Sequence, residues 1–159
     1  MSRPRVYLAG PDVFFANPKE HGAYLKKRCA DAGLVGVFPL DAEIVPSSAK
    51  RETARRIFDA NVGLIRSCQA VLANMTPFRG PSADVGTAWE MGYAAALSLK
   101  VVAYTEDPRM YAARVEQDGY EVESFDLRDN LMLACGAEVY FGLEAALVVL
   151  GSCGLGVLV

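Results

Sequence analysis

Two carboxylates lie close together in a stretch of the chain whose other residues are mostly small or apolar. Asp84 and Glu90 stand in the segment 78–94, where few side chains are large enough to cover them. Asp84 followed by Thr87 is typical of a helix N-cap, and Gly86 then lies one turn before Glu90, which leaves the Glu90 carboxylate in a notch. Carboxylate pairs perform glycosidic chemistry: one attacks an oxocarbenium-like anomeric carbon, and an acid helps the leaving group to depart.

The helix that carries this pair is predicted over about residues 84–99 and has hardly any polar surface. We therefore expect it to be mostly buried, and a carboxylate on a buried helix needs a function, because Glu is almost never fully buried unpaired. Gly86 costs such a helix about 1 kcal/mol relative to Ala, which favours a position where a ligand or another backbone comes close. The alternative is that Glu90 is an ordinary surface residue of an amphipathic helix.

Asp12 and Asp59 are further candidates for the same site. The expected topology places Asp12 in the loop after the first strand and Asp59 on a helix that could reach the strand ends. Each also has an ordinary structural interpretation: Asp12 could only stabilise a turn, and Asp59 could be an exposed helix residue.

Other catalytic classes find less support. The loop that begins at Gly10 does not match G-x-G-x-x-G, and no G-x-x-x-x-G-K-[ST] occurs, so we expect no nucleotide cofactor. His21 is the one histidine, and without a G-x-S-x-G elbow it does not indicate a serine or cysteine nucleophile. The four cysteines are far apart and form no C-x-x-C pair, which argues against a metal site.

Composition and charge limit the class of protein. With 159 residues, 52% of them apolar and 22% charged, the chain predicts a single globular domain over residues 1–159. A net charge of −3 without an extended Lys/Arg cluster argues against nucleic acid as a partner. Asp12 ends the first apolar run too early for a signal peptide, so we expect a cytoplasmic protein. Residues 143–159 are strongly apolar but interrupted by glycines and shorter than a membrane span, which predicts a final core helix and a tail buried against the body or another subunit.

Alternating apolar runs and helical patterns predict an α/β fold: a doubly wound, flavodoxin- or Rossmann-like open parallel sheet of about five strands with helices on both faces. The strands are expected over residues 5–9, 35–40, 69–74, 100–104 and 130–134, and the helices over 18–32, 50–67, 84–99 and 137–150, with a possible short helix at 111–117. In such sheets ligands bind beyond the carboxyl ends of the strands. The loop after the third strand leads directly to Asp84 and Glu90, so position and chemistry agree.

The motifs together resemble the nucleoside 2-deoxyribosyltransferase family. The resemblance rests on residues 7–14, on Asp59 with Asn61, on the pattern D-x-G-x-x-x-E-x-G-Y-A over residues 84–94, and on residues 130–132. It implies an enzyme that cleaves the N-glycosidic bond of a 2'-deoxynucleoside and passes the sugar to a free nucleobase, without a cofactor and in the context of a homo-oligomer.

The resemblance also implies roles for individual residues. Glu90 is the nucleophile that forms a deoxyribosyl ester, Tyr7 positions its carboxylate, Asp84 holds the sugar 3'-hydroxyl, and Asp59 exchanges a proton with the base. Phe14 packs against the base, while Asn130 and Met132 reach the 5'-hydroxyl in the site of a neighbouring subunit. Gly10, Asp12 and Gly86 complete the expected substrate-binding set.

Simple electrostatics supports a division of labour. Glu90 has to be ionised while Asp59 holds a proton, so burial is expected to raise the pKa of Asp59 and the Tyr7 hydroxyl to keep Glu90 charged.

Two other functions stay open. A hydrolase of a nucleoside or nucleotide 5'-monophosphate would use the same glutamate but would need an anion site, to which Arg79 or Arg128 could contribute. A nucleotide-sensing domain would bind a ligand in the notch without chemistry. The sequence does not fix which bases are accepted or the size of the oligomer.

Overall fold

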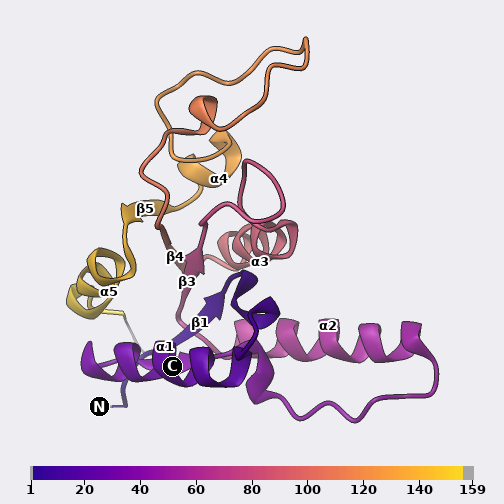
Figure 1. Ribbon diagram of the computed structural model, residues 1–159. Helices are drawn as coiled ribbons and strands as arrows, with labels where there is room; N and C mark the ends of the chain where they lie inside the picture. The colour runs from indigo at the N-terminus through magenta and orange to yellow at the C-terminus, as the bar shows by residue number, and fades with distance from the viewer. Residues whose placement is uncertain (1, 156–159) are drawn as a thin grey trace.

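The computed structural model describes residues 2–155 and contains a five-stranded, wholly parallel sheet in the order β2-β1-β3-β4-β5 (Figure 1). The strands are β1 (Arg5–Ala9), β2 (Val35–Val37), β3 (Ala70–Asn74), β4 (Lys100–Thr105) and β5 (Glu138–Phe141). Their continuous apolar character suits strands that are covered on both faces. The expected doubly wound α/β fold is confirmed, with the strand order of flavodoxin-like proteins.

Helices cover the sheet on both faces. On one face, α1 (Pro18–Asp31) and α5 (Leu143–Ser152) bury a cluster that includes Leu25, Cys29 and Leu147. On the other, α2 (Lys50–Arg66) and α3 (Val85–Ala96) enclose a second cluster with Tyr7, Ile65 and Met91. Tyr7 and its neighbours on β1 thus alternate between the two cores, as the pleat of a strand requires.

The prediction of a fifth strand at residues 130–134 is wrong. These residues form the short helix α4 (Leu131–Cys135), because the Asn130 side chain accepts a hydrogen bond from the Met132 backbone and caps the turn. The strand lies instead at β5, where a helix was expected from residue 137, and Gly142, with φ of 82°, ends it before α5 begins. A short apolar run has no distinctive period, so its cap and its neighbours decide its conformation.

The expectation that α3 is mostly buried is also wrong for a single chain. Val85 is 85% exposed and Trp89 is 46% exposed, and only Thr87, Met91 and Ala94 are buried. The Trp89 ring lies 5.1 Å from that of Phe58 on α2, which is itself exposed. The apolar residues of α3 therefore pack against the sheet on one side of the helix and form an exposed apolar surface on the other.

The remaining differences concern the ends of elements. β2 stops at Val37 and a 3-10 turn, η2 (Pro39–Asp41), replaces the end of the expected strand, while the predicted short helix at 111–117 is a 3-10 turn, η3 (Tyr111–Ala113). Leu155 packs against the core beside α5, and the tail expected beyond it, residues 156–159, lies outside the described residues. Within residues 2–155, no helix is both long and apolar enough to cross a bilayer.

Candidate active site

The fold brings the phenol of Tyr7 to the carboxylate of Glu90. Tyr7 is completely buried on β1, and its hydroxyl donates a 2.6 Å hydrogen bond to Glu90 Oε1 on the second turn of α3. Because β1 and α3 both pack in one core, the position of the carboxylate is set by the sheet and not by a surface loop. The predicted pairing of these two side chains is present.

Asp84 begins α3 as its N-cap. Its Oδ2 accepts hydrogen bonds from the backbone of Gly86 at 3.0 Å and of Thr87 at 3.3 Å. Its other carboxylate oxygen has no hydrogen-bond partner within residues 2–155 and is available to a ligand. A Cβ at Gly86 would come within 2.9 Å of the Asp84 carboxylate, so Gly is the residue that fits this cap.

Asp84 and Glu90 line a cleft of about 880 Å³ at the carboxyl edge of the sheet, which is large enough for a nucleoside; Tyr7 is completely buried and does not line it. Glu90, Asp84 and Gly86 come from α3, and Gly10, Val13 and Phe14 come from the loop after β1, part of which is the 3-10 turn η1 (Pro11–Phe14). The opposite wall is formed by α2 and the loop after β2; it contains Pro39, Leu40, Ala42, Glu43, Ile44, Val45, Pro46, Ile57 and Asn61.

Burial determines the charge of Glu90. It raises the pKa of Glu90 from its ordinary 4.5 to about 7; the Tyr7 hydrogen bond lowers this pKa, and the nearby Asp84 charge raises it further. The same burial, together with the Glu90 charge, raises the pKa of the Tyr7 hydroxyl, which therefore stays a donor. The expected effect of Tyr7 is present in direction, but it does not outweigh burial, so Glu90 changes protonation near neutral pH.

Four residues predicted to bind substrate or to take part in catalysis lie outside the cleft. Asp59 has a side chain that is 54% exposed and pairs with Arg55 at 3.0 Å, so the expected burial of this carboxylate is wrong. Asp12 is a buried residue of η1, and His21 and Asn74 hydrogen-bond to it. Asn130 caps α4 and donates to Glu123, and Met132 is 75% exposed. None of the four lines the cleft of its own chain.

Several cleft residues were not singled out from the sequence. The apolar wall at residues 39–46 follows β2, and that position at a strand's carboxyl end was the available signal. Asn61 lines the cleft together with Ile57, one helical turn away, whereas Asp59 lies on the other side of α2. Thr87 also lines the cleft, and its buried hydroxyl has no partner within residues 2–155.

The cleft is acidic. Among the described residues, its lining carries the carboxylates of Glu43, Asp84 and Glu90 and one ammonium group, that of Lys19. Arg79 stacks over the rings of Phe14 and Phe78, and Arg128 over that of Phe141; neither lines the cleft. This charge balance favours a neutral or cationic ligand over a phosphate dianion.

The fold and site define a class: flavodoxin-like α/β domains with a half-buried, tyrosine-bonded glutamate in a cleft at the carboxyl edge of the sheet. A family model described as nucleoside 2-deoxyribosyltransferase matches residues 6–132, which include every one of the predicted site residues. The chain belongs to this family, whose characterised members are enzymes.

Known structures and sequences agree with this assignment. A 2-deoxyribosyltransferase from Leishmania mexicana superposes with a TM-score of 0.80 at 32% identity, over 95% of this chain and 99% of that one. A 2-deoxyribosyltransferase from Bacillus psychrosaccharolyticus, at 18% identity and a TM-score of 0.66 over 91% and 90% of the two chains, shares the fold. The uncharacterized protein C191.05c of Schizosaccharomyces pombe is 38% identical over 115 residues, 70% of this chain and 54% of that protein, so the chain spans about half its length.

Proposed function

We propose that this protein transfers 2-deoxyribose from a 2'-deoxynucleoside to a second nucleobase through a covalent ester on Glu90. The observation that carries the proposal is the Tyr7–Glu90 hydrogen bond of 2.6 Å beside the cleft that Asp84 also lines. The carboxylate attacks C1' of the sugar, the base leaves with the bonding electrons and gains a proton, and a second base reverses the step. A 2'-deoxy sugar lacks the electron-withdrawing hydroxyl next to C1', so its oxocarbenium state is easier to reach.

The charge of the cleft supports a nucleoside over a nucleotide. Asp84 offers its free carboxylate oxygen to the 3'-hydroxyl as a hydrogen-bond acceptor, and Phe14 offers an aromatic face to the base. A 5'-phosphate would enter a lining with three carboxylates and one lysine. Lys19 is the one observation that favours the alternative, hydrolysis of a nucleotide 5'-monophosphate, since it could pair with a phosphate.

Two roles in the proposal depend on groups outside the cleft of one chain. The proposal keeps Asp59 as the proton donor to the departing base. To act, its side chain has to leave the exposed ion pair with Arg55, which is worth at most about 1 kcal/mol, take up a proton and turn towards the cleft. Asn130 and Met132 complete the site of a neighbouring copy at the 5'-hydroxyl. The substrates are a 2'-deoxynucleoside and a free base, and the assembly is a homo-oligomer.

The test is to incubate the purified protein with deoxyinosine, with and without free adenine, and to separate the products by chromatography. Deoxyadenosine formed only when adenine is added supports transfer. Equal release of hypoxanthine without adenine contradicts transfer and indicates a hydrolase, for which inosine and nucleotide 5'-monophosphates are the next substrates. No reaction with any of these contradicts both enzymes and leaves the sensing domain.

The covalent step has its own test. Intact-protein mass spectrometry after mixing with deoxyinosine alone should show the mass of one added deoxyribosyl group, and the added mass should vanish when adenine follows. Glu116→Gln, on an exposed residue outside the cleft, is the control and should show the same adduct. Transfer without a detectable adduct in either protein would contradict the ester.

A further inference from the structure

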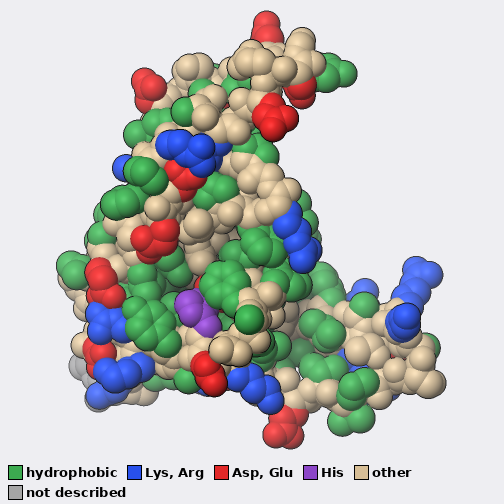
Figure 2. All heavy atoms as spheres, viewed as in Figure 1, with side chains coloured by type: hydrophobic (Ala, Val, Ile, Leu, Met, Phe, Trp, Pro, Cys, Tyr) green, Lys and Arg blue, Asp and Glu red, His purple; other side chains and the backbone are tan. Residues whose placement is uncertain are grey.

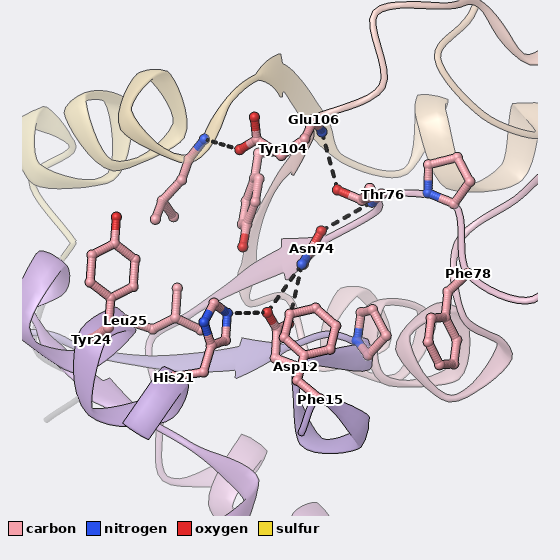
Figure 3. A pocket seen from close by; sticks show the side chains of 13 residues that line it. Asp12, Phe15, His21, Tyr24, Leu25, Asn74, Thr76, Phe78, Tyr104 and Glu106 are labelled. Carbon is pink, nitrogen blue, oxygen red and sulfur yellow. Dashed lines mark hydrogen bonds and ion pairs between the residues drawn. The ribbon is translucent and has the colours of Figure 1, made fainter. Parts of the chain in front are cut away.

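A second cavity, of about 280 Å³, lies on the other side of η1 from the catalytic cleft. The turn gives Val13 and Phe14 to the cleft, and Pro11 and Asp12 to the cavity. The two linings share none of the described residues. In Figure 2 the purple histidine side chain lies in a hollow framed by hydrophobic side chains, and Figure 3 shows the cavity from close by.

One polar group on the wall of this cavity has no hydrogen-bond partner among residues 2–155. Tyr104 on β4 is only 5% exposed, and its hydroxyl makes no hydrogen bond with any group of residues 2–155. In Figure 3 its ring stands among the other lining side chains without a dashed line at the hydroxyl. Burial and the nearby charges of Asp12 and Glu106 raise the pKa of Tyr104, so the hydroxyl is present as a donor and acceptor. The hydroxyl opens onto the cavity, so a ligand atom there can hydrogen-bond to it in place of solvent.

The charge of the lining is negative. Asp12 and Glu106 are its carboxylates, it contains no Lys or Arg among the described residues, and it stays negative whether or not His21 is protonated. Asp12 already binds His21 at 2.7 Å and Asn74 at 3.2 Å. Glu106 accepts one backbone hydrogen bond, from Leu143 at 3.2 Å to its Oε1, and its Oε2 remains free among the described residues. An anion would therefore be repelled, and a cation attracted.

The rest of the lining is aromatic. The ring of His21 lies 5.0 Å from that of Phe15 and 6.0 Å from that of Tyr24, so three rings follow one another along one wall. Aromatic faces attract cations and accept flat apolar groups. The volume is near the lower end for ligand sites, which limits the occupant to about the size of one ring with a short substituent.

We propose that this cavity is a second binding site, which takes a small organic cation with an ammonium group and an apolar body. The ammonium group lies between the Tyr104 hydroxyl and the Glu106 carboxylate, and the apolar body lies against Phe15 and Tyr24. The site does not depend on deoxyribosyl transfer, because it shares no residue with the cleft.

The test uses benzylammonium as the probe, with benzyl alcohol as a neutral probe of the same shape and benzoate as an anion. Binding is titrated with the full chain by ligand-observed NMR. We expect benzylammonium to bind at millimolar concentration, benzyl alcohol about tenfold more weakly and benzoate not measurably. Equal binding of the cation and the alcohol, or no binding of the cation, would overturn the proposal.

Variants test whether the probe binds in this cavity. Tyr104→Phe removes only the hydroxyl, and Glu106→Gln removes the charge but keeps an acceptor for Leu143; each should weaken benzylammonium about fivefold. Glu116→Gln on the surface and Glu90→Gln in the cleft should bind it as the unchanged protein does. Unchanged binding by both cavity variants, or loss of binding in Glu90→Gln, would contradict this site. Circular dichroism checks the fold of each variant.

Discussion

The cleft differs from the arm, which is residues 106–130 together with α4, in how its side chains are held in place. In the cleft, Tyr7 and Glu90 come from β1 and α3, and both elements pack in the same core. The arm leaves the sheet after β4 and returns at β5 (Figure 1). Its outer part is exposed: Tyr120 is 81% exposed and Phe125 is 62% exposed. One region is held by the sheet, and the other carries much of its apolar surface uncovered.

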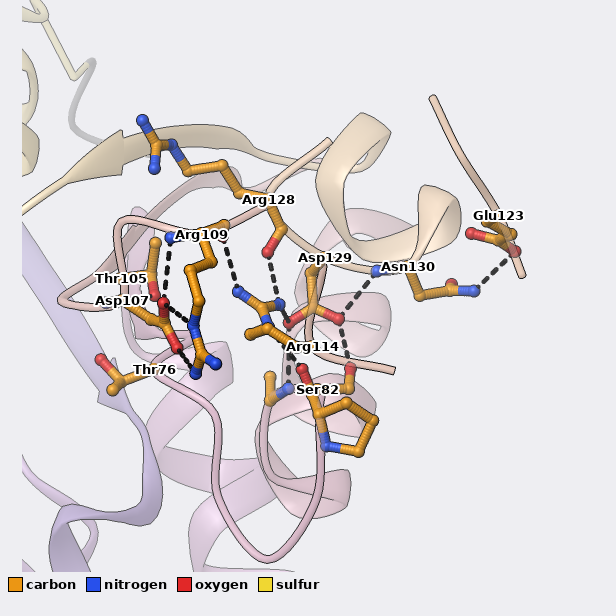
Figure 4. A network of polar contacts seen from close by, with 12 residues as sticks. Thr76, Ser82, Thr105, Asp107, Arg109, Arg114, Glu123, Arg128, Asp129 and Asn130 are labelled. Atoms are coloured by element: carbon orange, nitrogen blue, oxygen red, sulfur yellow. Dashed lines mark hydrogen bonds and ion pairs between the residues drawn. The ribbon is translucent and has the colours of Figure 1, made fainter. Parts of the chain in front are cut away.

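The base of the arm is nevertheless firmly attached. The guanidinium of Arg114 lies 3.5 Å from the Asp129 carboxylate, and the two side chains are 2% and 0% exposed (Figure 4). Asp129 accepts hydrogen bonds from Ser82 and from the Ala83 backbone, in the loop that leads into Asp84. Arg114 donates to the carbonyls of Pro81, Arg109 and Arg128. The buried pair thus joins the arm to the segment that begins α3.

This difference indicates how the proposed active site is divided between the cleft and the arm. The groups expected to break the glycosidic bond are preorganised within one chain, whereas those expected to hold the 5'-hydroxyl stand on an arm whose residues do not line the cleft of that chain. Exposed apolar side chains on the arm and on α3 fit a surface that another copy covers. The first region should therefore fail chemically when changed, and the second through assembly and substrate binding.

The largest expected effect is on the rate of transfer. Glu90→Gln should lower kcat by at least about 10⁴-fold, because the amide cannot attack C1', while it keeps the shape of the side chain. Steady-state production of deoxyadenosine from deoxyinosine and adenine measures it. Glu43→Gln, another carboxylate of the cleft, is the comparison and should lose far less. Comparable losses in both variants would remove the special role of Glu90.

The next effect concerns the attachment of the arm. Arg114→Ala should lower the free energy of unfolding by about 3–5 kcal/mol, because it leaves Asp129 charged and buried without its partner. Urea denaturation followed by circular dichroism measures this. Arg109→Ala is the matched control on the same arm; its pair with Asp107 is open to solvent, so its effect should be much smaller. Equal effects would mean that the buried pair does not hold the arm.

The half-buried Glu90 should also make stability depend on pH. The folded chain keeps the Glu90 proton up to about pH 7, whereas the unfolded chain loses it near 4.5. The folded state therefore binds more protons in this window, and the free energy of unfolding falls as the pH rises through it, by up to about 3 kcal/mol. Urea denaturation at pH 5 and pH 8 measures this. The free energy of unfolding of Glu90→Gln, relative to that of the unchanged protein, should be higher at pH 8 than at pH 5. Parallel behaviour of the two proteins would contradict the raised pKa.

The cleft was largely predictable because its signals are local. Asp84 followed by Thr87 marks the start of α3, and the uninterrupted apolar runs of β1 and β3 fix the sheet that supports it. The partnership of Tyr7 with Glu90 came from the family resemblance, since nothing in the spacing of two residues so far apart shows that they meet. Family patterns supply long-range pairs that local patterns do not contain.

The arm was not predictable for a physical reason. Residues 131–135 are apolar without a period, so their helix depends on the Asn130 cap, and that cap competes with the expected contact of Asn130 with substrate. Asn61 on α2 lines the cleft and Asp59 does not. Which side of α2 faces the cleft depends on how this long and largely exposed helix packs against the sheet, and the sequence of the helix does not fix that. The exposure of Val85 and Trp89 depends on surfaces outside one chain, which composition does not reveal.

The smallest effect tests whether the arm acts on a neighbouring subunit. Asn130→Ala should raise KM for the deoxynucleoside about tenfold with little change in kcat, because one hydrogen bond to the substrate is lost. Asn130→Ser keeps a side-chain oxygen for the cap of α4 but loses the amide group, so it separates capping from binding without placing a second charge beside Glu123. If Ser restores KM, the effect of Ala is only structural.

Mixing two inactive or weakened proteins then decides where the arm acts. When Glu90→Gln and Asn130→Ala subunits exchange, a hybrid contains one site with both Glu90 and Asn130 only if Asn130 comes from the neighbouring copy. Activity at low deoxyinosine should then exceed the sum of the two separate proteins. If Asn130 serves its own chain, no hybrid has a complete site and the activities only add. Additivity under conditions where subunit exchange is shown by mass spectrometry would contradict a shared site, and with it the division between a self-contained cleft and an arm that works in another subunit.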